Sequence, residues 1–272
     1  MIFVAAGTQD GRELAGFLLE HGYRVTASVV SRYGEQLLER YRGIAVNDKP
    51  LDAEGLKDFL KEHGARILVD ASHPYAANVS RNSMEACHGL GIPYLRYERE
   101  GTPVTYSKVF RVTSYEEAAK KAAELGKNVF FTTGSRNLRI FKESPYLEGC
   151  RLVSRVLPSP DVISEMTGMG FQPKDIVALQ GPFSQELNEA LFRQYEADVI
   201  VTKNSGQIGG ADTKLAAAEA MGLPVVLIEK PKMEYDNIAG TFEEVLEFVQ
   251  GHEKKATTVQ EQGKDVRKCP SL

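Results

Sequence analysis

The amino-acid sequence predicts an α/β protein with two domains, each built on a mostly parallel sheet with helices on both faces. Three observations predict this fold class. Apolar segments of strand length alternate with helical segments along almost the whole chain. Many of these apolar segments run directly into turns that contain glycine, proline and hydroxyl side chains. A polar stretch at residues 100–108 divides the series in two, and we expect it to join the domains.

The first domain is expected over residues 1–99. Two of its predicted helices end at Gly22 and Gly64, because glycine readily adopts the left-handed conformation that closes a helix. The apolar run Ile67-Leu68-Val69 predicts a strand. In chain order, the sequence predicts strands at 1–6, 24–30, 43–46, 66–71 and 93–97, and helices at 11–21, 33–41, 53–63 and 76–88.

The second domain is expected over residues 109–250. Helix starts are indicated by capping boxes, Ser114 with Glu117 and Thr241 with Glu244, and by Pro160 at a first helical position. Residues 251–272 are polar and lack an apolar period, so we expect a flexible tail. Strands are predicted at 109–112, 129–133, 152–157, 176–180, 199–202 and 224–228, and helices at 114–125, from 160, at 184–195, 213–221 and 241–249.

Composition limits the classes of function. The 272 residues include 42% apolar side chains, enough for two cores, and a net charge of −4 argues against a general nucleic-acid or membrane-surface binder. Cys87, Cys150 and Cys269 are too far apart to form a metal-ligand pair or a disulfide framework. The N-terminal segment lacks a basic region, and no apolar run approaches the roughly 20 residues of a membrane span. We therefore expect a cytoplasmic protein with no metal site, no nucleic-acid partner and no membrane partner.

The most informative segment is the loop after residues 199–202. It reads Lys203-Asn204-Ser205-Gly206-Gln207-Ile208-Gly209-Gly210, and the next helix contains Thr213 and Lys214. Glycines let the backbone approach a ligand closely, and a helix N-terminus presents N–H groups to an anion. With a lysine on either side, the loop predicts a pocket for an acidic ligand.

The turn after the first strand reads Gly7-Thr8-Gln9-Asp10-Gly11-Arg12. It has the position of a dinucleotide fingerprint but lacks the G-x-G-x-x-G spacing, so two interpretations stay open. The turn contacts a phosphate, or it is a tight turn in which Asp10 caps the helix. The end of the second strand, Ser28-Val29-Val30-Ser31-Arg32, has no carboxylate for ribose hydroxyls. Its hydroxyls and guanidinium suit a 2′-phosphate, so NADPH is favoured over NADH if a dinucleotide binds there.

A second polar cluster, Asp70-Ala71-Ser72-His73-Pro74-Tyr75-Ala76, follows another strand of the first domain. His21 and His63 each precede a glycine at a helix end, and we interpret both as structural. His73 lies in a strand-to-helix loop, so lining a site and a structural role are both open for it. One interpretation of Asp70 is that it holds the backbone of this loop.

The second domain repeats the pattern of strand end, glycine or proline, and polar side chain. Each of these loops is also compatible with an ordinary capped turn, but together at one sheet edge they predict a broad polar cleft. Arg136, Arg155, Lys203 and Lys214 are available there for carboxylates, unless several are solvated surface residues. Arg96 and Arg99 extend the set. The loops are Thr132-Thr133-Gly134-Ser135-Arg136, Arg155-Val156-Leu157-Pro158-Ser159-Pro160 and Gln180-Gly181-Pro182-Phe183-Ser184.

This ordered set of motifs resembles the precorrin-6A reductase family of cobalamin biosynthesis over about residues 1–249. Each motif is weak alone, and the order makes the set specific. The motifs are Gly7-Thr8 with Arg12, the segment from Asp70 to Ala76, Phe131-Thr132-Thr133-Gly134, Arg155-Val156-Leu157-Pro158, Gln180-Gly181-Pro182-Phe183-Ser184, and Lys203-Asn204-Ser205-Gly206 with Gly209-Gly210 and Thr213-Lys214.

The resemblance implies a two-domain Rossmann-like reductase with its ligand cleft between the domains. It implies NADPH-dependent reduction of a C=C bond of the tetrapyrrole-derived macrocycle precorrin-6A, or of its cobalt form, to the 6B form. Hand-over of the product to neighbouring pathway enzymes is a further expectation. A non-catalytic sensor of an anionic metabolite or nucleotide, and an NADP-dependent reductase of another acidic substrate, are the alternatives.

The expected roles follow the two domains. His73, Tyr75 and Lys203 are candidates for proton donation or positioning, with water as an alternative donor. The nucleotide is expected at Gly7, Thr8, Arg12, Ser28, Ser31, Arg32, Ser72 and His73. The macrocycle is expected at Thr133, Gly134, Ser135, Arg136, Arg155, Gly181, Ser184, Lys203, Asn204, Ser205, Gly206, Gly209, Gly210, Thr213 and Lys214.

Overall fold

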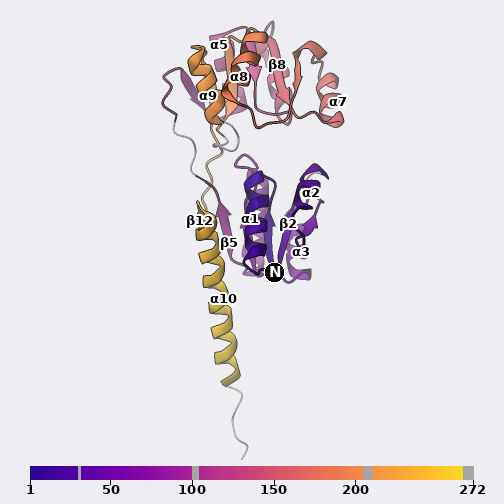
Figure 1. Ribbon diagram of the computed structural model, residues 1–272, viewed down its shortest axis with the longest axis vertical. Helices are drawn as coiled ribbons and strands as arrows, with labels where there is room; N and C mark the ends of the chain where they lie inside the picture. Colours follow the sequence, from indigo (N-terminus) through magenta and orange to yellow (C-terminus); the bar gives the residue numbers. More distant parts are fainter. Residues whose placement is uncertain (30–31, 100–103, 205–210, 266–272) are drawn as a thin grey trace, which may run out of the picture. The chain divides into compact units, whose positions relative to one another are not determined.

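The computed structural model describes residues 1–29, 32–99, 104–204 and 211–265 (Figure 1). The chain divides into two compact units, Met1–Glu100 with Lys232–Leu272, and Gly101–Pro231. Each unit holds a six-stranded sheet, and every pairing between the described strands is parallel. The predicted fold class, α/β with two Rossmann-like domains and parallel sheets, is confirmed.

The sheet of the first unit has the order β12-β5-β4-β1-β2-β3. Read from β3, this is the 3-2-1-4-5-6 order of dinucleotide-binding sheets, with β12 in the sixth place. Its strands are β1 (Ile2–Ala5), β2 (Val25–Ser28), β3 (Ala45–Asn47), β4 (Ile67–Asp70), β5 (Tyr94–Tyr97) and β12 (Ile238–Ala239).

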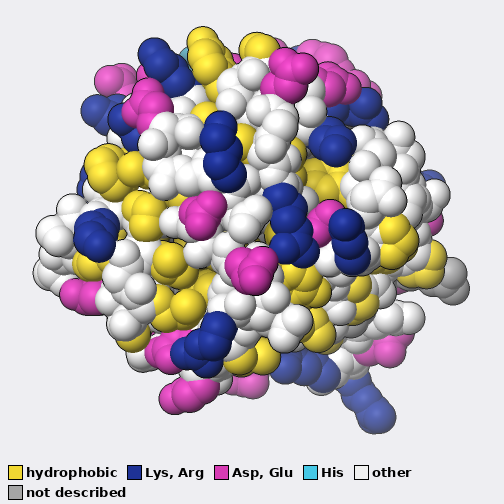
Figure 2. All heavy atoms as spheres, turned by 90° about the horizontal axis from the view of Figure 1, so that it is seen from above, with side chains coloured by type: hydrophobic (Ala, Val, Ile, Leu, Met, Phe, Trp, Pro, Cys, Tyr) yellow, Lys and Arg dark blue, Asp and Glu magenta, His cyan; other side chains and the backbone are white. Residues whose placement is uncertain are grey.

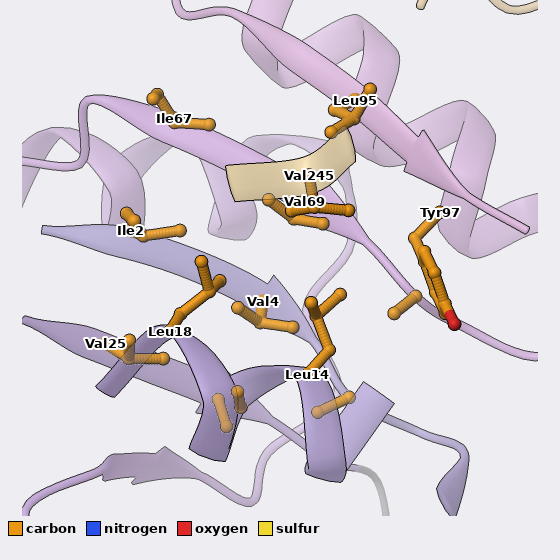
Figure 3. Packing of buried hydrophobic residues seen from close by; sticks show 14 of the residues in the cluster. Ile2, Val4, Leu14, Leu18, Val25, Ile67, Val69, Leu95, Tyr97 and Val245 are labelled. Carbon is orange, nitrogen blue, oxygen red and sulfur yellow. The ribbon is translucent and has the colours of Figure 1, made fainter. Parts of the chain in front are cut away.

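Alternate residues of these strands are buried on opposite faces of the sheet, as the period of two requires. Ile2 and Val4 pack against Leu14 and Val245 on one face, which is covered by α1 and α10 (Figure 3). Phe3 lies in a second cluster with side chains of α3 and α4. Burial of each large apolar side chain stabilises the fold by about 1.5–3 kcal/mol. The helices are α1 (Gln9–Glu20), α2 (Arg32–Leu38), α3 (Ala53–Glu62), α4 (Ala77–Leu90) and α10 (Phe242–Asp265).

The chain after Pro231 returns to the first unit. Ile238 and Ala239 pair with Arg96 and Tyr97 of β5, and Figure 1 shows α10 following directly. This division differs from the expected second domain at 109–250, because β12 and α10 complete the first sheet and its core rather than the second. The helix also continues to Asp265, beyond the end expected near residue 249.

The sheet of the second unit has the order β6-β11-β10-β7-β8-β9. Read from β9, strands β9, β8, β7, β10 and β11 repeat the 3-2-1-4-5 order, and β6 takes the sixth place. Its strands are β6 (Val109–Val112), β7 (Asn128–Phe131), β8 (Arg151–Val156), β9 (Ile176–Ala178), β10 (Val199–Lys203) and β11 (Val225–Ile228).

Helices cover both faces of this second sheet. Phe130 packs in a cluster with Phe192 of α8 and Leu215 of α9. Phe131 points the other way and contacts Phe141 of α6, with 4.5 Å between ring centroids. The helices are α5 (Tyr115–Leu125), α6 (Leu138–Lys142), α7 (Pro160–Gly168), α8 (Gln185–Gln194) and α9 (Ala211–Ala220), with short 3-10 turns η1 (Pro145–Leu147) and η2 (Pro173–Asp175).

The helix starts predicted at Ser114, Thr241 and Pro160 are confirmed. The Ser114 hydroxyl accepts from the Glu117 N–H at 3.0 Å. Thr241 and Glu244 each accept from the other's backbone N–H, at 3.2 and 3.3 Å. Pro160 occupies the first turn of α7. Local side-chain chemistry therefore sets these helix starts as the sequence indicates.

The surface view in Figure 2 shows basic, acidic and hydrophobic side chains interspersed on one face. None of the helices that the structure describes has the length and apolar character of a bilayer span.

Candidate active site

The first candidate site lies at the carboxyl ends of the paired strands β1 and β4. From there the chain continues toward β2 on one side and toward β5 on the other. Ala5 pairs with both Ser28 and Asp70, so the turns after β1, β2 and β4 leave the same edge. In sheets of this order, nucleotides bind beyond the carboxyl ends of the strands at this switch point. The register therefore brings together the three predicted cofactor segments that begin at Gly7, Ser28 and Ser72.

The Gly7–Arg12 turn is closed by Thr8. Its hydroxyl donates to the carbonyl of Ala71 at 3.0 Å and accepts from the N–H of Gly11 at 2.9 Å, which makes Thr8 the N-cap of α1. A Cβ on Gly11 would lie 2.9 Å from both Ala6 Cα and the Ala71 carbonyl oxygen, so only glycine allows this close helix–strand packing. At Gly7 a Cβ would meet nothing within 4 Å, so the backbone there faces open space.

Asp10 does not cap the helix, because Thr8 already holds that position. Asp10 lies in the first turn of α1 and pairs with Arg99, with 3.3 Å between Oδ1 and Nη2. Burial raises the pKa of Asp10, and Arg99 opposes this rise. Arg99 is thus held against a carboxylate of its own unit, and it also lies over the ring of Phe242.

Asp70 and Arg96 anchor the loop after β4. Asp70 Oδ1 lies 3.0 Å from Arg96 Nη1, and its carboxylate also accepts from Ser72 N–H, the Ser80 hydroxyl and the Tyr94 hydroxyl. Burial acts to raise the pKa of Asp70, but Arg96 and the hydrogen bonds outweigh it and hold the pKa below its usual value. The interpretation that Asp70 holds the loop backbone is confirmed. Arg96 belongs to this buried network, not to an exposed cationic surface.

Ser72 is buried in the same network. Its hydroxyl accepts from Arg96 Nη1 at 3.2 Å, and its carbonyl accepts from Nη2 at 3.1 Å. His73 and Tyr75 lie further out in the loop, with His73 exposed and Tyr75 half-buried. The Tyr75 N–H donates to His73 Nδ1 at 3.3 Å, and their rings lie 5.6 Å apart. Of these three side chains, His73 and Tyr75 have the access that a ligand contact requires.

Ser28 lies on the other side of the switch point, at the carboxyl end of β2. Its hydroxyl accepts from Asn47 Nδ2 at 3.0 Å, and this amide also donates to the carbonyl of Lys49. Asn47 ends β3 and pairs with Ser28, so it joins the candidate site although it was not among the predicted residues. Ser31 lies outside the described residues, and of Arg32 the structure describes only the backbone, at the start of α2.

His21 and His63 have the structural roles expected of them. Each Nδ1 lies within hydrogen-bond distance of the carbonyl four residues earlier, and each ring packs on a phenylalanine at that position. The described residues contain no cluster of three or more His, Cys, Asp or Glu side chains suited to a metal ion.

The second candidate site lies at the switch point of the second sheet, between β7 and β10. Phe131 pairs with Val201, so the segment from Thr132 to Arg136 and the end of β10 at Lys203 leave the same edge. Gly134 has φ +78°, a left-handed conformation that favours glycine. Thr133 is buried, Ser135 is half-buried and Arg136 is exposed.

Lys203 is the cation of this switch point. Its Nζ lies 5.5 Å from the centroid of the Tyr115 ring. Burial, followed by repulsion from Arg136, lowers the pKa of the Lys203 ammonium to about 8. A lysine with this pKa is mainly protonated at neutral pH and is nevertheless acidic enough to donate a proton.

A second group of cations lies between β8, α8 and α9. Arg155 Nη1 donates to Asn188 Oδ1 at 2.8 Å, and the guanidinium lies 3.8 Å from the centroid of the Phe183 ring. Asn188 Nδ2 donates to the Ser184 carbonyl and approaches the Thr213 hydroxyl at 3.5 Å. Burial lowers the pKa of Arg155 to about 10. Burial, followed by repulsion from Arg155, lowers the pKa of Lys214 to about 8, with Asp212 acting in the opposite direction.

Of the remaining predicted substrate residues, the structure describes Gly181, Ser184 and Asn204. Ser184 caps α8 by accepting from the Leu187 N–H at 3.2 Å, and Gly181 precedes it in a loop whose Gly181-Pro182 bond is cis. Asn204 follows β10, and its N–H donates to the Ile228 carbonyl at 3.3 Å. Ser205, Gly206, Gly209 and Gly210 lie outside the described residues.

Asn188 joins this group although it was not among the predicted residues. It is fully buried and links Arg155 to the first turn of α8 and to Thr213. A signal for it exists, because Asn188 precedes the core residue Phe192 by four positions and so shares its helix face.

The fold and these residues define an α/β protein with two Rossmann-like parallel sheets, in which the edge of the second sheet holds desolvated cations. A family model described as Precorrin-6x reductase CbiJ/CobK matches residues 1–250. This chain belongs to that family.

Curated relatives and one solved structure agree with the family. The chain is 42% identical to a cobalt-precorrin-6A reductase of Priestia megaterium over 247 residues, 90% of this chain and 96% of the relative. It is 34% identical to a protein of the same name from Salmonella typhimurium (strain LT2), covering 85% and 87%. A solved structure of CobK precorrin-6A reductase has a TM-score of 0.76 and 27% identity, covering 92% of this chain and 96% of that one.

Proposed function

We propose that this protein reduces one C=C bond of cobalt-precorrin-6A to the 6B form with NADPH, in cobalamin biosynthesis. The observation that carries the proposal is the match to curated cobalt-precorrin-6A reductases over nine-tenths of the chain, with 42% identity to one of them. A relative named precorrin-6A reductase, from Rhodococcus erythropolis, is 31% identical. Four relatives that carry the cobalt name are 34–42% identical, above this value, which favours the cobalt form of the macrocycle as substrate.

The first unit is the proposed nucleotide site. Its strand order, the close packing at Gly11 and the open space at Gly7 suit a dinucleotide whose phosphates approach the turn after β1. At the end of β2 stands Ser28 with Asn47 beside it, and neither is a carboxylate that would compete with a 2′-phosphate. Thr8, Arg12, Ser31 and Arg32 complete the proposed phosphate contacts, with His73 toward the nicotinamide. The predicted nucleotide contact of Ser72 is replaced by a supporting role, because its buried side chain is held by Arg96. When bound, NADPH supplies a hydride.

The second unit is the proposed macrocycle site. Carboxylates of the substrate bind to Arg136, Arg155, Lys203 and Lys214, with hydroxyl and backbone N–H groups of the strand-end loops beside them. Each charge-assisted hydrogen bond of this kind contributes about 1.5–3 kcal/mol. The hydroxyls and N–H groups are those of Thr133, Gly134, Ser135, Gly181, Ser184, Asn204, Ser205, Gly206, Gly209, Gly210 and Thr213.

The reduction adds a hydride to one ring carbon and a proton to its neighbour. Lys203 is the proposed proton donor, because burial has brought its pKa to about 8. His73 and Tyr75 are the proposed alternatives, since both are accessible in the loop after β4. Their variants His73→Ala and Tyr75→Phe keep full hydride-transfer rates in single turnover if Lys203 is the donor.

A steady-state assay tests the proposed function. The protein is mixed with NADPH or NADH and with cobalt-precorrin-6A or the metal-free macrocycle, and the nicotinamide absorbance is followed. We expect the greatest kcat/KM with NADPH and the cobalt macrocycle. Oxidation of neither nucleotide with either macrocycle would overturn the proposal.

A further inference from the structure

The carboxyl ends of β8 and β9 carry apolar side chains beside a buried cation. Leu157 and Leu179 are 53% and 39% exposed, which places both among the exposed large hydrophobic side chains of the described chain. They lie next to each other, because Val156 pairs with Ala178 and the Leu179 N–H donates to the Val156 carbonyl at 3.0 Å. Two adjoining apolar side chains at the carboxyl edge of a parallel sheet are placed where they can contact an apolar part of a ligand.

Arg155 lies two residues before Leu157 on the same strand. Its side chain is only 5% exposed, and one face of the guanidinium is covered by Phe183. Within the described residues, its hydrogen bond is to the neutral Asn188, and no carboxylate lies within ion-pair distance. A buried guanidinium without a carboxylate is unfavourable for the folded protein, so its presence at this sheet edge favours an anionic ligand.

Lys214 adds a second positive charge to the same place. It is 8% exposed, lies next to Thr213 of the Asn188 network and is close enough to Arg155 for mutual repulsion. Asp212 acts on Lys214 in the opposite direction, so the Arg155 guanidinium is the charge here that most favours an anionic ligand group. The neighbouring leucines favour a ligand whose charged group is attached to an apolar body.

We propose that Arg155, Lys214, Leu157 and Leu179 form one amphipathic seat that holds a carboxylate-bearing edge of the macrocycle. This inference rests on the proposed function, since the macrocycle is the ligand that joins carboxylates to a large apolar ring. The two cations bind a side-chain carboxylate of the substrate, and the two leucines contact the adjoining ring face. Asn188 and Phe183 are positioning residues that fix the Arg155 guanidinium. The seat orients the ring and contributes to substrate binding, not to nucleotide binding.

Leucine variants provide the cleanest test, because both side chains are exposed and their replacement leaves the core intact. We expect Leu157→Ser and Leu179→Ser each to raise the KM for cobalt-precorrin-6A by several-fold, and the double variant by about tenfold or more. The dissociation constant for NADPH stays unchanged. Tyr146→Ser is the matched control, since Tyr146 is 52% exposed in the same unit and lies in η1, before β8 begins.

Arg155 provides a second test, in which substrate binding is expected to weaken without a loss of thermal stability. Arg155→Met combined with Asn188→Leu removes the cation and its partner together, so we expect an equal or higher Tm and a KM raised by about 10- to 100-fold. A purely structural Arg155 would instead lower the Tm and leave the KM unchanged. Arg139→Gln is the control, because Arg139 is an exposed cation of the same unit.

Direct titration with cobalt-precorrin-6A, followed by the absorbance of the macrocycle, separates this inference from the proposed function. If the wild-type protein binds the macrocycle without reducing it, the proposed function fails while the seat variants still test the inference. Weaker macrocycle binding in the seat variants, with wild-type affinity in both controls, supports the seat. Unchanged macrocycle affinity in the leucine and arginine variants overturns it, and so does a loss of NADPH affinity alone, which would assign the seat to the nucleotide.

Discussion

Asp70 and Arg96 form an ion pair in which both side chains are completely buried, with 3.0 Å between Oδ1 and Nη1. The two residues are register partners on β4 and β5, at the carboxyl edge of the first sheet. Asp70 also accepts from Ser72, and Arg96 donates to the Ser72 hydroxyl and carbonyl. This pair therefore fixes the start of the loop that presents His73 and Tyr75.

Removal of one partner of this pair leaves the other as an uncompensated buried charge. We expect Asp70→Asn to lower the free energy of unfolding by about 3–5 kcal/mol, measured by denaturant titration. Arg139→Ala, which breaks an exposed pair with Glu143, should change it by less than about 1 kcal/mol. Equal effects of the two substitutions would show that the buried pair has no special role.

The stability that Asp70 contributes depends on pH. Its folded-state pKa lies below the ordinary value of 3.8, so the contribution is fully present above that value. It is lost as pH falls through the lower folded-state pKa, where the carboxylate becomes protonated. We expect the stability difference between wild type and Asp70→Asn to be constant above about pH 5 and to shrink below pH 3.8. A difference that grows on acidification would contradict this assignment.

Substitutions at the two glycines of the turn after β1 test two different effects, namely core packing at Gly11 and ligand contact at Gly7. Gly11→Ala forces a Cβ to within 2.9 Å of Ala6 and Ala71, so we expect it to destabilise the first unit by about 1–3 kcal/mol. Gly7→Ala meets no atom within 4 Å, so it should keep the stability and weaken NADPH binding where a phosphate approaches. Calorimetric titration with NADPH and thermal unfolding measure the two effects. Unchanged NADPH affinity in Gly7→Ala would place the phosphates elsewhere.

A carboxylate at the end of β2 should change the choice of nucleotide. Ser28→Asp places a negative charge where the 2′-phosphate is proposed to lie, so we expect the KM for NADPH to rise at least about tenfold. The KM for NADH should stay the same or fall, because a carboxylate binds ribose hydroxyls. Arg32→Ala should likewise raise the KM for NADPH and leave that for NADH nearly unchanged. Equal changes for both nucleotides would remove the 2′-phosphate assignment.

The low pKa of Lys203 predicts a pH limit for the reaction. Below about pH 8 the ammonium is charged and can bind a carboxylate or donate a proton, and above it this ability is lost. We expect kcat/KM for the macrocycle to fall above about pH 8 in the wild type. Lys203→Arg should shift this fall to higher pH if charge alone matters, and should abolish turnover if proton donation is required. An identical pH profile in Lys203→Gln would exclude both roles.

Local signals made much of the fold predictable from the sequence. Ser114, Ser184 and Thr241 cap the helices they precede, and the apolar runs before Gly7 and His73 form strands β1 and β4. The candidate residues at predicted strand ends lie at the carboxyl edges of the two sheets, because every pairing between the described strands is parallel. Apolar periodicity and helix capping depend on residues a few positions apart, so both can be recognised in a single sequence.

The return of the C-terminal segment to the first unit was not predictable in the same way. Ile238 and Ala239 make a strand of two residues, too short for any alternation to be recognised. Its partner β5 lies more than 130 residues earlier, and pairing over this separation depends on which sheet edge is open. The domain expected at 109–250 therefore included a segment that belongs to the first unit.

The roles of buried polar residues were likewise not predictable from the sequence. Arg96 resembles a free junction cation in the sequence, but its register partner Asp70 makes it a structural residue. Asn188 resembles a helix-surface amide, but it faces inward and holds Arg155. Such roles follow from contacts between distant segments, which composition and spacing do not encode.

The most direct test of the proposed reaction follows the hydride itself. Cobalt-precorrin-6A is reduced in single turnover with NADPH that carries deuterium at nicotinamide C4, on one face and then on the other. We predict that one of the two nucleotides transfers one deuterium to a ring carbon of the product, detected by mass spectrometry. A reduced product without deuterium from either nucleotide, or a macrocycle recovered unchanged, would contradict the account.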